Sequence, residues 1–584
     1  MESRNQRKIL LINMVLAALI LSTLFYVFES TGASNYDYNA FGNGVDIWGK
    51  VYHLVLNDYV EEVDPEDLAL DGVNGMLENL DPYTSFFIQR DFKQLEEDSK
   101  GEFAGLGIMI GPLNDYPTVM EPPIEDSPAM KNGMTAGDAI VEIEGKSTFK
   151  MPINDVVGKL RGEVNTIVNI AVKRGNREDL IKLSIKREKI PLKNILYSGE
   201  IEKDIGYIKL TKFNAEAPSE MRDSLEVLLE NDNIKGVILD LRLNPGGLLN
   251  VAHEISNMFL PKNSLIVYTK GRNSSENREF LANKMPILPQ KPLVVLINRG
   301  SASASEIVAG AIQDWDRGVL VGETTFGKGL VQTLHPLSEG AGLKLTTAKY
   351  YTPSGRCIQR DNFREDMVAF SEEEEELRGS VESEEDSLKQ HAKFFTKTKE
   401  RVVYEGGGVT PDIIVKEKPV GNIITQFAVQ SVFYDFAFLC KDNHPDLKQD
   451  FEITEELVNE FKEYISDEKV FKYEIPGKSY LDNFKKTIER EEYDGDVLDM
   501  IAGIEKTLAE RRDDDFDANI DTIKRILKRE ISGTMFGSST RIKATKEWDV
   551  QLLKAIEILQ NPDMYNSILS EGAETGVVAE VSGK

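Results

Sequence analysis

The sequence predicts a multidomain α/β protein with a helical region towards each end. Apolar strand-like runs alternate with helical spacing between residues 200 and 360, a pattern typical of a largely parallel sheet. Residues 100–187 contain short β-like runs and many glycines. Residues 36–99 and the chain beyond Gly421 have the spacing of amphipathic helices. Together these three observations predict the fold class.

Length and charge exclude some functions. The 584 residues suffice for roughly three to five domains. The net charge of −29 argues against broad nucleic-acid binding, which needs a basic surface. Two cysteines, Cys357 and Cys440, do not make a disulfide framework and leave the redox compartment open.

A basic segment followed by an apolar one opens the chain. Arg4, Arg7 and Lys8 precede residues 9–28, a run without charge and long enough to cross a bilayer as one helix. The basic flank predicts that residues 1–8 stay in the cytosol. A cleaved signal peptide is the alternative, but its apolar core is shorter and ends in small residues. We therefore expect an uncleaved anchor, with the bulk of the chain exported.

The individual elements follow from apolar spacing and turn residues. Helices are expected at 47–59, 65–80, 153–161, 219–230, 248–260, 481–491 and 520–531, and another that opens near Ser303. Strands are expected at 205–210, 237–241, 293–298 and 319–322. The acidic, aromatic-free run 371–389 predicts a solvated or disordered insertion over 361–401.

The stretch GETTFGKGLVQ, residues 322–332, allows two interpretations. Its first seven residues fit the phosphate-binding pattern G-x-x-x-x-G-K. That pattern also needs Ser or Thr after the lysine and a helix facing the phosphates. Position 329 is Gly, and a turn at 339–342 predicts a hairpin. Nucleotide hydrolysis is thus the minor alternative.

A candidate nucleophile lies just upstream. In RGSASASEIVAGAIQD, residues 299–314, small side chains leave room for a substrate backbone. A helix that opens at Ser303 presents free N–H groups suited to an oxyanion. The same residues, Ser303 to Glu306, also form the S-x-x-E capping box, which helices use without catalysis.

A lysine is the candidate base, because none of the five histidines lies in a recognisable triad context. The pKa of Lys328 must then fall from about 10.4 to between about 7 and 8, which burial promotes. Phe326 and the nearby glycines fit a dry site, and Gln332 holds the amine without adding charge. His335 is expected to be an ordinary surface or core histidine.

These residues resemble the carboxyl-terminal processing peptidases, or tail-specific proteases. Ser303 in S-A-S-A-S-E, Lys328 in T-F-G-K-G 25 residues later, and Gln332 after four more match the family register. The resemblance implies that these three residues are the nucleophile, the base and the residue that orients the base.

Further stretches resemble the same family. DLRLNPGG, residues 240–247, implies an oxyanion hole formed by the amide of Gly246 or Gly247 together with that of Ala304. KYYTPSGRCIQ (349–359), GVTPDIIV (408–415) and LDPYTSFF (80–87) resemble other family motifs. The resemblance implies a crotonase-like α/β protease core over 188–360 and 402–418.

Residues 100–187 resemble the PDZ domain that these proteases carry, inserted before the core. GEFAGLGIMI, residues 101–110, implies a loop that binds a chain-terminal carboxylate. The substrate-binding residues implied are Gly105, Leu106, Gly107 and Ile108, with Arg161 of LRG sensing bound substrate.

The predicted protein is a membrane-anchored serine endopeptidase of the bacterial inner membrane that faces the periplasm. It would capture unfolded or exposed C-terminal tails and need no metal or cofactor. A PDZ-based scaffold, or a protease that rests inactive until a partner acts, is the alternative. The helical region 419–584 is open to four roles: self-association, shielding the active site, adaptor binding or stabilising the core.

Overall fold

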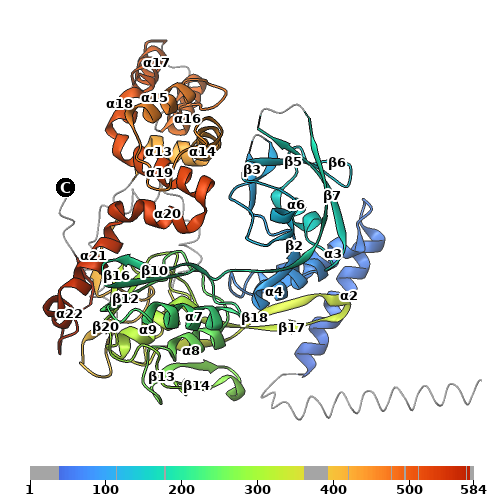
Figure 1. The fold of residues 1–584 in the computed structure, drawn as a ribbon. Coiled ribbons are helices and arrows are strands. Elements are labelled where there is room, and N and C mark those ends of the chain that lie inside the picture. The colour runs from blue at the N-terminus through green and yellow to red at the C-terminus, as the bar shows by residue number, and fades with distance from the viewer. Residues whose placement is uncertain are drawn as a thin grey trace, which may run out of the picture. The chain divides into compact units, whose positions relative to one another are not determined.

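The computed structural model describes residues 38–113, 115–175, 179–360, 392–417, 420–474, 477–491, 495–510, 512–573 and 575–578. They divide into two units, up to Phe86 and from Phe87 onward (Figure 1). The predicted cytosolic tail 1–8, the anchor 9–28 and the acidic run 371–389 lie outside the described residues.

Within the described ranges, no single helix has both the length and the apolar character to cross a membrane. The helices Asn422–Val429 and Val432–Asn443 reach that length and apolar character only as a pair, and the pair is bent by 67° at its break.

In the first unit, the described residues from 38 to 86 form the helices α2 (Tyr38–Asp58) and α3 (Pro65–Leu77). Asp64 caps α3 by accepting hydrogen bonds from the N–H groups of Glu66 and Asp67. The predicted helical region 36–99 is divided, because α4 (Gln89–Lys100) belongs to the second unit.

A seven-stranded sheet forms the centre of the second unit. Its order is β10-β11-β12-β15-β16-β21-β22. The strands are β10 (Ile195–Glu202), β11 (Ile205–Leu210), β12 (Gly236–Asp240), β15 (Leu293–Ile297), β16 (Val319–Gly322), β21 (Ile413–Ile414) and β22 (Val577–Val578). Only β10 runs antiparallel to its neighbour. The predicted parallel sheet is present, and its near-continuous apolar runs are those of strands buried on both faces.

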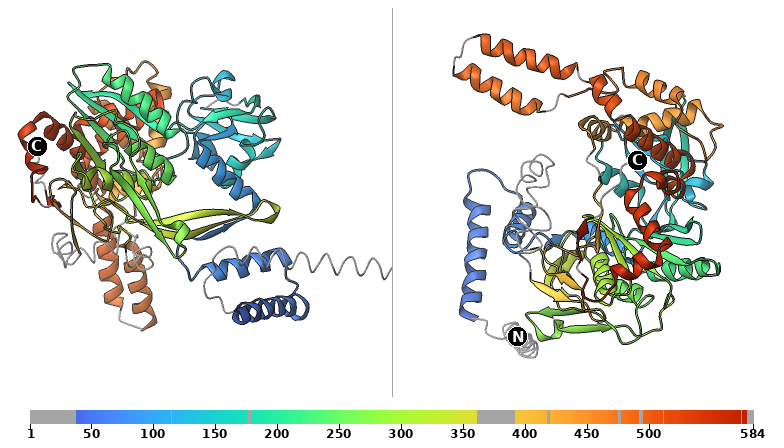
Figure 2. Two further views of the ribbon diagram at one scale, coloured as in Figure 1. Left: turned by 90° about the horizontal axis from the view of Figure 1, so that it is seen from below. Right: turned by 90° about the vertical axis from the view of Figure 1, so that its left-hand side faces the viewer.

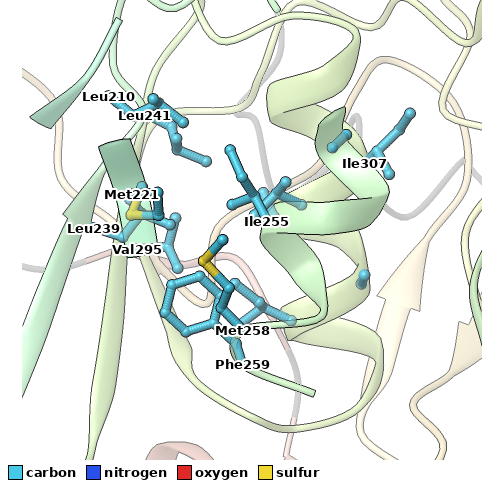
Figure 3. Packing of buried hydrophobic residues seen from close by; sticks show 14 of the residues in the cluster. Leu210, Met221, Leu239, Leu241, Ile255, Met258, Phe259, Val295 and Ile307 are labelled. Atoms are coloured by element: carbon cyan, nitrogen blue, oxygen red, sulfur yellow. The ribbon is translucent and has the colours of Figure 1, made fainter. Parts of the chain in front are cut away.

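Helices cover both faces of this sheet. On one face α7 (Ala217–Leu229), α8 (Leu249–Ser256) and α9 (Ala304–Asp314) pack over Leu239 and Val295 (Figure 3). On the other face α21 (Val550–Gln560) and α22 (Pro562–Ile568) pack over the alternate strand residues. Alternation of side chains along each strand supplies both apolar surfaces.

The packing of α21 and α22 differs from the predicted domain boundary. Residues 419–584 were expected to form one helical domain, yet Leu552 and Ile556 are buried against the core sheet. An apolar stripe predicts a helix but does not identify the surface that it covers. These two helices therefore cover the far face of the core sheet.

A second sheet contains β13 (Leu265–Gly271), β14 (Arg278–Leu281) and the hairpin β17–β18 (Leu330–Pro336, Gly342–Tyr351). The hairpin follows Lys328 directly, as predicted. A strand therefore stands where a phosphate-binding loop needs a helix, which argues against nucleotide binding.

The segment expected to be a PDZ domain contains a sheet in the order β3-β4-β5-β7-β8, with β6 beside β5. Its elements are β3 (Ile110–Leu113), β4 (Tyr116–Val119), α5 (Pro128–Lys131), β5 (Asp138–Ile143), β6 (Lys146–Ser147), α6 (Ile153–Leu160), β7 (Ile167–Arg174) and β8 (Ile181–Lys186). Before and after it, β2 (Glu102–Gly105) pairs with β9 (Glu188–Pro191). This pairing brings the two ends together, as an inserted domain requires.

The C-terminal helices have a core of their own. Phe427, Phe433, Phe436, Phe461 and Phe516 pack ring against ring. The helices are α13 (Asn422–Val429), α14 (Val432–Asn443), α15 (Glu455–Tyr464), α16 (Lys478–Arg490), α17 (Gly495–Ala509), α18 (Arg512–Ala518), α19 (Ile520–Phe536) and α20 (Ser538–Thr545). Figure 2 shows α16 and α17 side by side as a helical hairpin.

The described end of the predicted acidic insertion also belongs to the core. Within 392–401, β19 (Lys393–Phe395) pairs with β20 (Val402–Tyr404). Arg401 is buried and lies 2.6 Å from an Asp316 oxygen and 2.7 Å from an Asp412 oxygen. The two carboxylates thus compensate the burial of the Arg401 guanidinium. The prediction of a solvated insertion over 361–401 had placed this charge in water.

Replacing Arg401 by alanine should lower the free energy of unfolding by about 3–5 kcal/mol, because Asp316 and Asp412 would remain buried without their cation. Urea unfolding measures the change. Arg490→Ala is the matched control: its bridge to Glu491 is exposed and should contribute at most about 1 kcal/mol. Equal effects from both variants would contradict the prediction.

Candidate active site

Residues from four segments meet at one cleft of about 490 Å³. Its lining includes Gly246 and Gly247 from the loop after β12, Ser303 at the start of α9, Lys328 from the loop after β16, and Gln332 on β17. These are the three predicted catalytic residues and two of the predicted oxyanion residues. The structure therefore brings them together from positions up to 86 residues apart in the chain.

Ser303 occupies a strained backbone position. Its φ of 55° and ψ of −111° are rare for a side-chain-bearing residue, and such strain concentrates at functional sites. The Glu306 carboxylate accepts the Ser303 N–H at 2.7 Å, so the predicted helix cap is also present. Capping and catalysis are compatible here, because the bond uses the backbone of Ser303.

The structure separates Ser303 from the neighbouring serines. Ser301 and Ser305 are fully buried, and their hydroxyls donate to the carbonyl oxygens of Leu241 (2.8 Å) and Asn244 (2.9 Å). Ser303 is partly exposed and lines the cleft. Only Ser303 of the three is placed to meet a substrate.

The glycine loop approaches the start of α9 closely. A Cβ on Gly246 would lie 2.7 Å from the Ala304 nitrogen and 2.5 Å from the Ala302 oxygen. The Gly246 N–H donates to Asn244 Oδ1 at 2.9 Å. In the described part of the chain, the N–H groups of Gly247 and Ala304 have no such acceptor. The geometry therefore favours Gly247 over Gly246 as the amide beside that of Ala304.

Gly246→Ala should lower kcat by roughly 10²- to 10³-fold, the cost of losing one oxyanion donor, because the methyl group would displace the Ala304 amide. Steady-state kinetics measure the effect. The control is Gly133→Ala, which shares a positive φ (75° against 91°) but has open space around the new methyl. If both variants retained activity, the tight approach at Gly246 would be irrelevant to catalysis.

The backbone of Lys328 is held from two sides. Its N–H donates to Glu306 Oε2 at 3.0 Å. The Tyr350 hydroxyl lies 2.5 Å from the Lys328 carbonyl oxygen and 3.1 Å from that of Ser303. Tyr350 and Glu306 therefore both bridge the nucleophile and lysine segments.

Gln332 lies on β17 in the same cleft. Its amide nitrogen donates to Thr346 Oγ1 at 3.4 Å on the paired strand. That bond does not use the Gln332 amide oxygen, which is the atom that can accept a hydrogen bond from an amine. The predicted contact with the Lys328 amine would use this oxygen.

The sequence did not show that Glu306 and Tyr350 connect the serine and lysine segments of this site. Glu306 was recognised only as half of a capping box, and Tyr350 only as part of KYYTPSGRCIQ. Burial raises the pKa of Glu306 to about 7, while hydrogen bonds from Thr325, Gly327, Lys328 and Ser303 lower it. Its carboxyl group thus titrates close to neutral pH.

The raised pKa of Glu306 predicts a pH-dependent stability. Between its ordinary value of 4.5 and about 7, the folded state keeps a proton that the unfolded state has lost. The contribution is present below pH 4.5 and lost as the pH rises to about 7. Relative to Glu306→Gln, the parent should therefore lose about 3 kcal/mol of unfolding free energy across this range. Urea unfolding at several pH values measures this, and parallel curves would contradict it.

The residues predicted to form the carboxylate-binding loop differ in part from the expected loop and strand. Gly105 ends β2, paired with Glu188, and only Gly107 has a positive φ (79°). Leu106 is buried in the domain core, and Ile108 packs against that core. The strand expected directly after the loop begins only at Ile110, since residues 106–109 make no ladder.

Arg161 lies at the end of α6, 4.5 Å from the centre of the Phe103 ring. Its guanidinium is 3.8 Å from Asp98, which also lies 3.6 Å from Lys212. Asp98 and Lys212 both line the cleft. A chain of charges therefore connects Arg161 to the candidate active site.

Comparison with known families agrees with this arrangement. Peptidase family S41 matches residues 204–369, and a PDZ domain matches residues 120–174. A family described as the C-terminal helical domain of a probable PDZ-protease matches residues 423–559.

Several relatives align over most of their length. A carboxy-terminal-processing protease of Bartonella bacilliformis is 38% identical over 381 residues, 65% of this chain and 87% of the relative. Carboxy-terminal processing protease CtpA of Bacillus subtilis is 34% identical over 362 residues, 62% and 76% respectively. The solved photosystem II D1 C-terminal processing protease is 30% identical over 53% of this chain and 84% of its own, with a TM-score of 0.32. The chain accordingly belongs to peptidase family S41, as a serine-type carboxy-terminal processing protease with a PDZ domain and a C-terminal helical domain.

Proposed function

We propose that the protein is a membrane-anchored endopeptidase that cleaves the C-terminal tails of exported proteins with a Ser303–Lys328 dyad. The observation that carries this proposal is the shared cleft. Ser303 and Lys328 line it, and the N–H groups of Gly247 and Ala304 beside them donate to no acceptor in the described residues.

The reaction follows from these groups. Neutral Lys328 accepts the proton of the Ser303 hydroxyl while Oγ attacks the peptide carbonyl carbon. The amides of Gly247 and Ala304 hold the negative oxygen of the tetrahedral intermediate. Protonated Lys328 then gives the proton to the leaving amine as the C–N bond breaks, which forms an acyl-enzyme.

A water molecule completes the cycle. Lys328, neutral again, takes a proton from the water as it attacks the ester, and returns a proton to Ser303 when the new carboxyl product leaves. Gln332 orients the amine through its amide oxygen without adding charge, which would otherwise favour the ammonium form of Lys328.

Selection of substrates is assigned to the PDZ domain. The loop from Gly105 to Ile108 would bind the terminal carboxylate of an unfolded tail, whose residues add as a strand to the sheet edge. Arg161 would report occupancy to the cleft through Asp98 and Lys212, which supports a protease whose activity depends on a bound tail.

A tail-exchange experiment tests the function. The full chain in detergent micelles is incubated with an unfolded protein that ends in apolar residues, and with the same protein ending in two aspartates. EDTA is present and nucleotide is absent. We expect cleavage of the first substrate and at least about tenfold slower cleavage of the second, a difference of about 1.4 kcal/mol. Equal rates would overturn tail recognition, and binding without cleavage would favour a scaffold.

The location is a separate part of the proposal. It is supported by the basic residues Arg4, Arg7 and Lys8 before the apolar run 9–28. In a bacterial host, the full chain should remain in the membrane fraction after alkaline carbonate extraction, and a protease added to spheroplasts should digest it. Release of the full chain by carbonate would contradict an uncleaved anchor.

A further inference from the structure

We infer that Glu306 is a positioning residue that sets the nucleophile and the base in register by holding both of their backbones with one buried carboxylate. The inference rests on the proposed Ser303–Lys328 dyad and concerns how the fold aligns that dyad.

The Glu306 carboxylate is fully buried and receives four donors. Oε2 accepts the backbone N–H of Ser303 at 2.7 Å and that of Lys328 at 3.0 Å. Oε1 accepts the Gly327 N–H at 2.7 Å and the Thr325 hydroxyl at 2.6 Å. One oxygen atom is therefore shared by the backbones of the two catalytic residues.

Helix capping accounts for only one of these four bonds. A capping box needs the bond to the Ser303 N–H. The other three reach residues 325–328, which stand 19 to 22 positions further along the chain. They fix the lysine loop to the start of α9, and so they fix the two ends of the proton-transfer path.

The loop is anchored beyond Glu306 as well. The Thr325 hydroxyl, which donates to Glu306, accepts the Val409 N–H at 2.7 Å. A Cβ on Gly408 would lie 2.5 Å from the Thr325 carbonyl oxygen. The segment GVTPDIIV thus packs against the lysine loop, which Glu306 and Tyr350 link to the serine segment.

At the mildly alkaline pH at which Lys328 is proposed to act, Glu306 is ionised, and the carboxylate then satisfies this set of donors because it is acceptor-only. Glutamine has the same length but turns an NH₂ group towards two of the donors. Aspartate is one methylene shorter and does not span both segments. Each substitution should misalign the dyad while the PDZ domain remains unaffected.

The test uses the full chain carrying Glu306→Gln and, separately, Thr325→Val, which removes one of the four donors. A serine-directed covalent probe, a fluorophosphonate, counts active sites, so that kcat is expressed per labelled Ser303. We expect kcat per site to fall about 100-fold in Glu306→Gln and about 3- to 10-fold in Thr325→Val, and KM for the tail substrate to change less than about twofold.

The following outcomes decide the inference. A kcat per site within about threefold of the parent in Glu306→Gln would overturn it and leave a structural cap. A change confined to KM would also overturn it. If Glu306→Gln does not fold, Thr325→Val decides alone: unchanged kcat refutes the inference. If Ser303→Ala were inactive while Glu306→Gln kept the kcat of the parent, this inference would be rejected and the proposed function would still be supported.

Discussion

Ser303→Ala is expected to abolish peptide cleavage, with kcat lowered by roughly 10⁴- to 10⁶-fold, as for other serine nucleophiles. The substitution removes the Oγ that is proposed to form the acyl-enzyme but keeps the hydrogen bond from the Ser303 N–H to Glu306. Single-turnover cleavage of an unfolded protein with an apolar C-terminus measures the loss, and tail affinity should be unchanged.

The neighbouring serines provide the matched controls. Ser301→Ala and Ser305→Ala each remove a buried hydroxyl that donates to a backbone carbonyl. They should cost about 1–3 kcal/mol of stability, because that acceptor is left unsatisfied. Activity per folded molecule should remain within about tenfold of the parent. Cleavage that survived in Ser303→Ala would remove this serine from the mechanism.

Local sequence patterns were sufficient to predict the parallel sheet and the spacing of the candidate catalytic residues along the chain. Residues 205–210, 293–297 and 319–322 are short apolar runs bounded by turns, and each became a buried parallel strand. The spacing between Ser303 and Lys328 matched a known family, and both residues line one cleft. These features depend on neighbours in the chain or on motif register, which a sequence displays directly.

Other features depend on contacts that no local pattern shows. The apolar stripe of α21 is typical of a helix, but its partner, the far face of the core sheet, is formed by residues between 197 and 415, which precede α21 by at least 135 positions. Arg401 fell within the predicted insertion 361–401, which was expected to be solvated because of the acidic run 371–389, whereas Asp316 and Asp412 hold it in the interior. Glu306 showed only the helix cap, because the loop that it also binds comes from another segment.

Lys328→Met should reduce kcat by roughly 10³- to 10⁶-fold, because methionine keeps most of the side-chain volume but has no amine to take the Ser303 proton. The backbone contacts of residue 328 with Glu306 and Tyr350 do not involve its side chain. The loop should therefore keep its place, and KM should stay close to that of the parent.

The choice of control makes this a test of proton transfer rather than of charge. Lys344 lines the same cleft, so Lys344→Met removes one positive charge there without removing the proposed base. We expect that variant to keep activity within about tenfold. Lys328→Arg restores the charge but stays protonated at any practical pH, so it should be as inactive as Lys328→Met.

The pH profile adds an independent criterion. Parent activity should rise towards mildly alkaline pH as Lys328 loses its proton, and Lys344→Met should follow the same curve. If Lys328→Arg were active, the residue would act as a positive charge near the oxyanion and the base would be another group. An inactive Lys328→Arg beside an active Lys344→Met would support a lysine that must give up its proton, because arginine keeps the positive charge at position 328 and the cleft tolerates the loss of a charge at position 344.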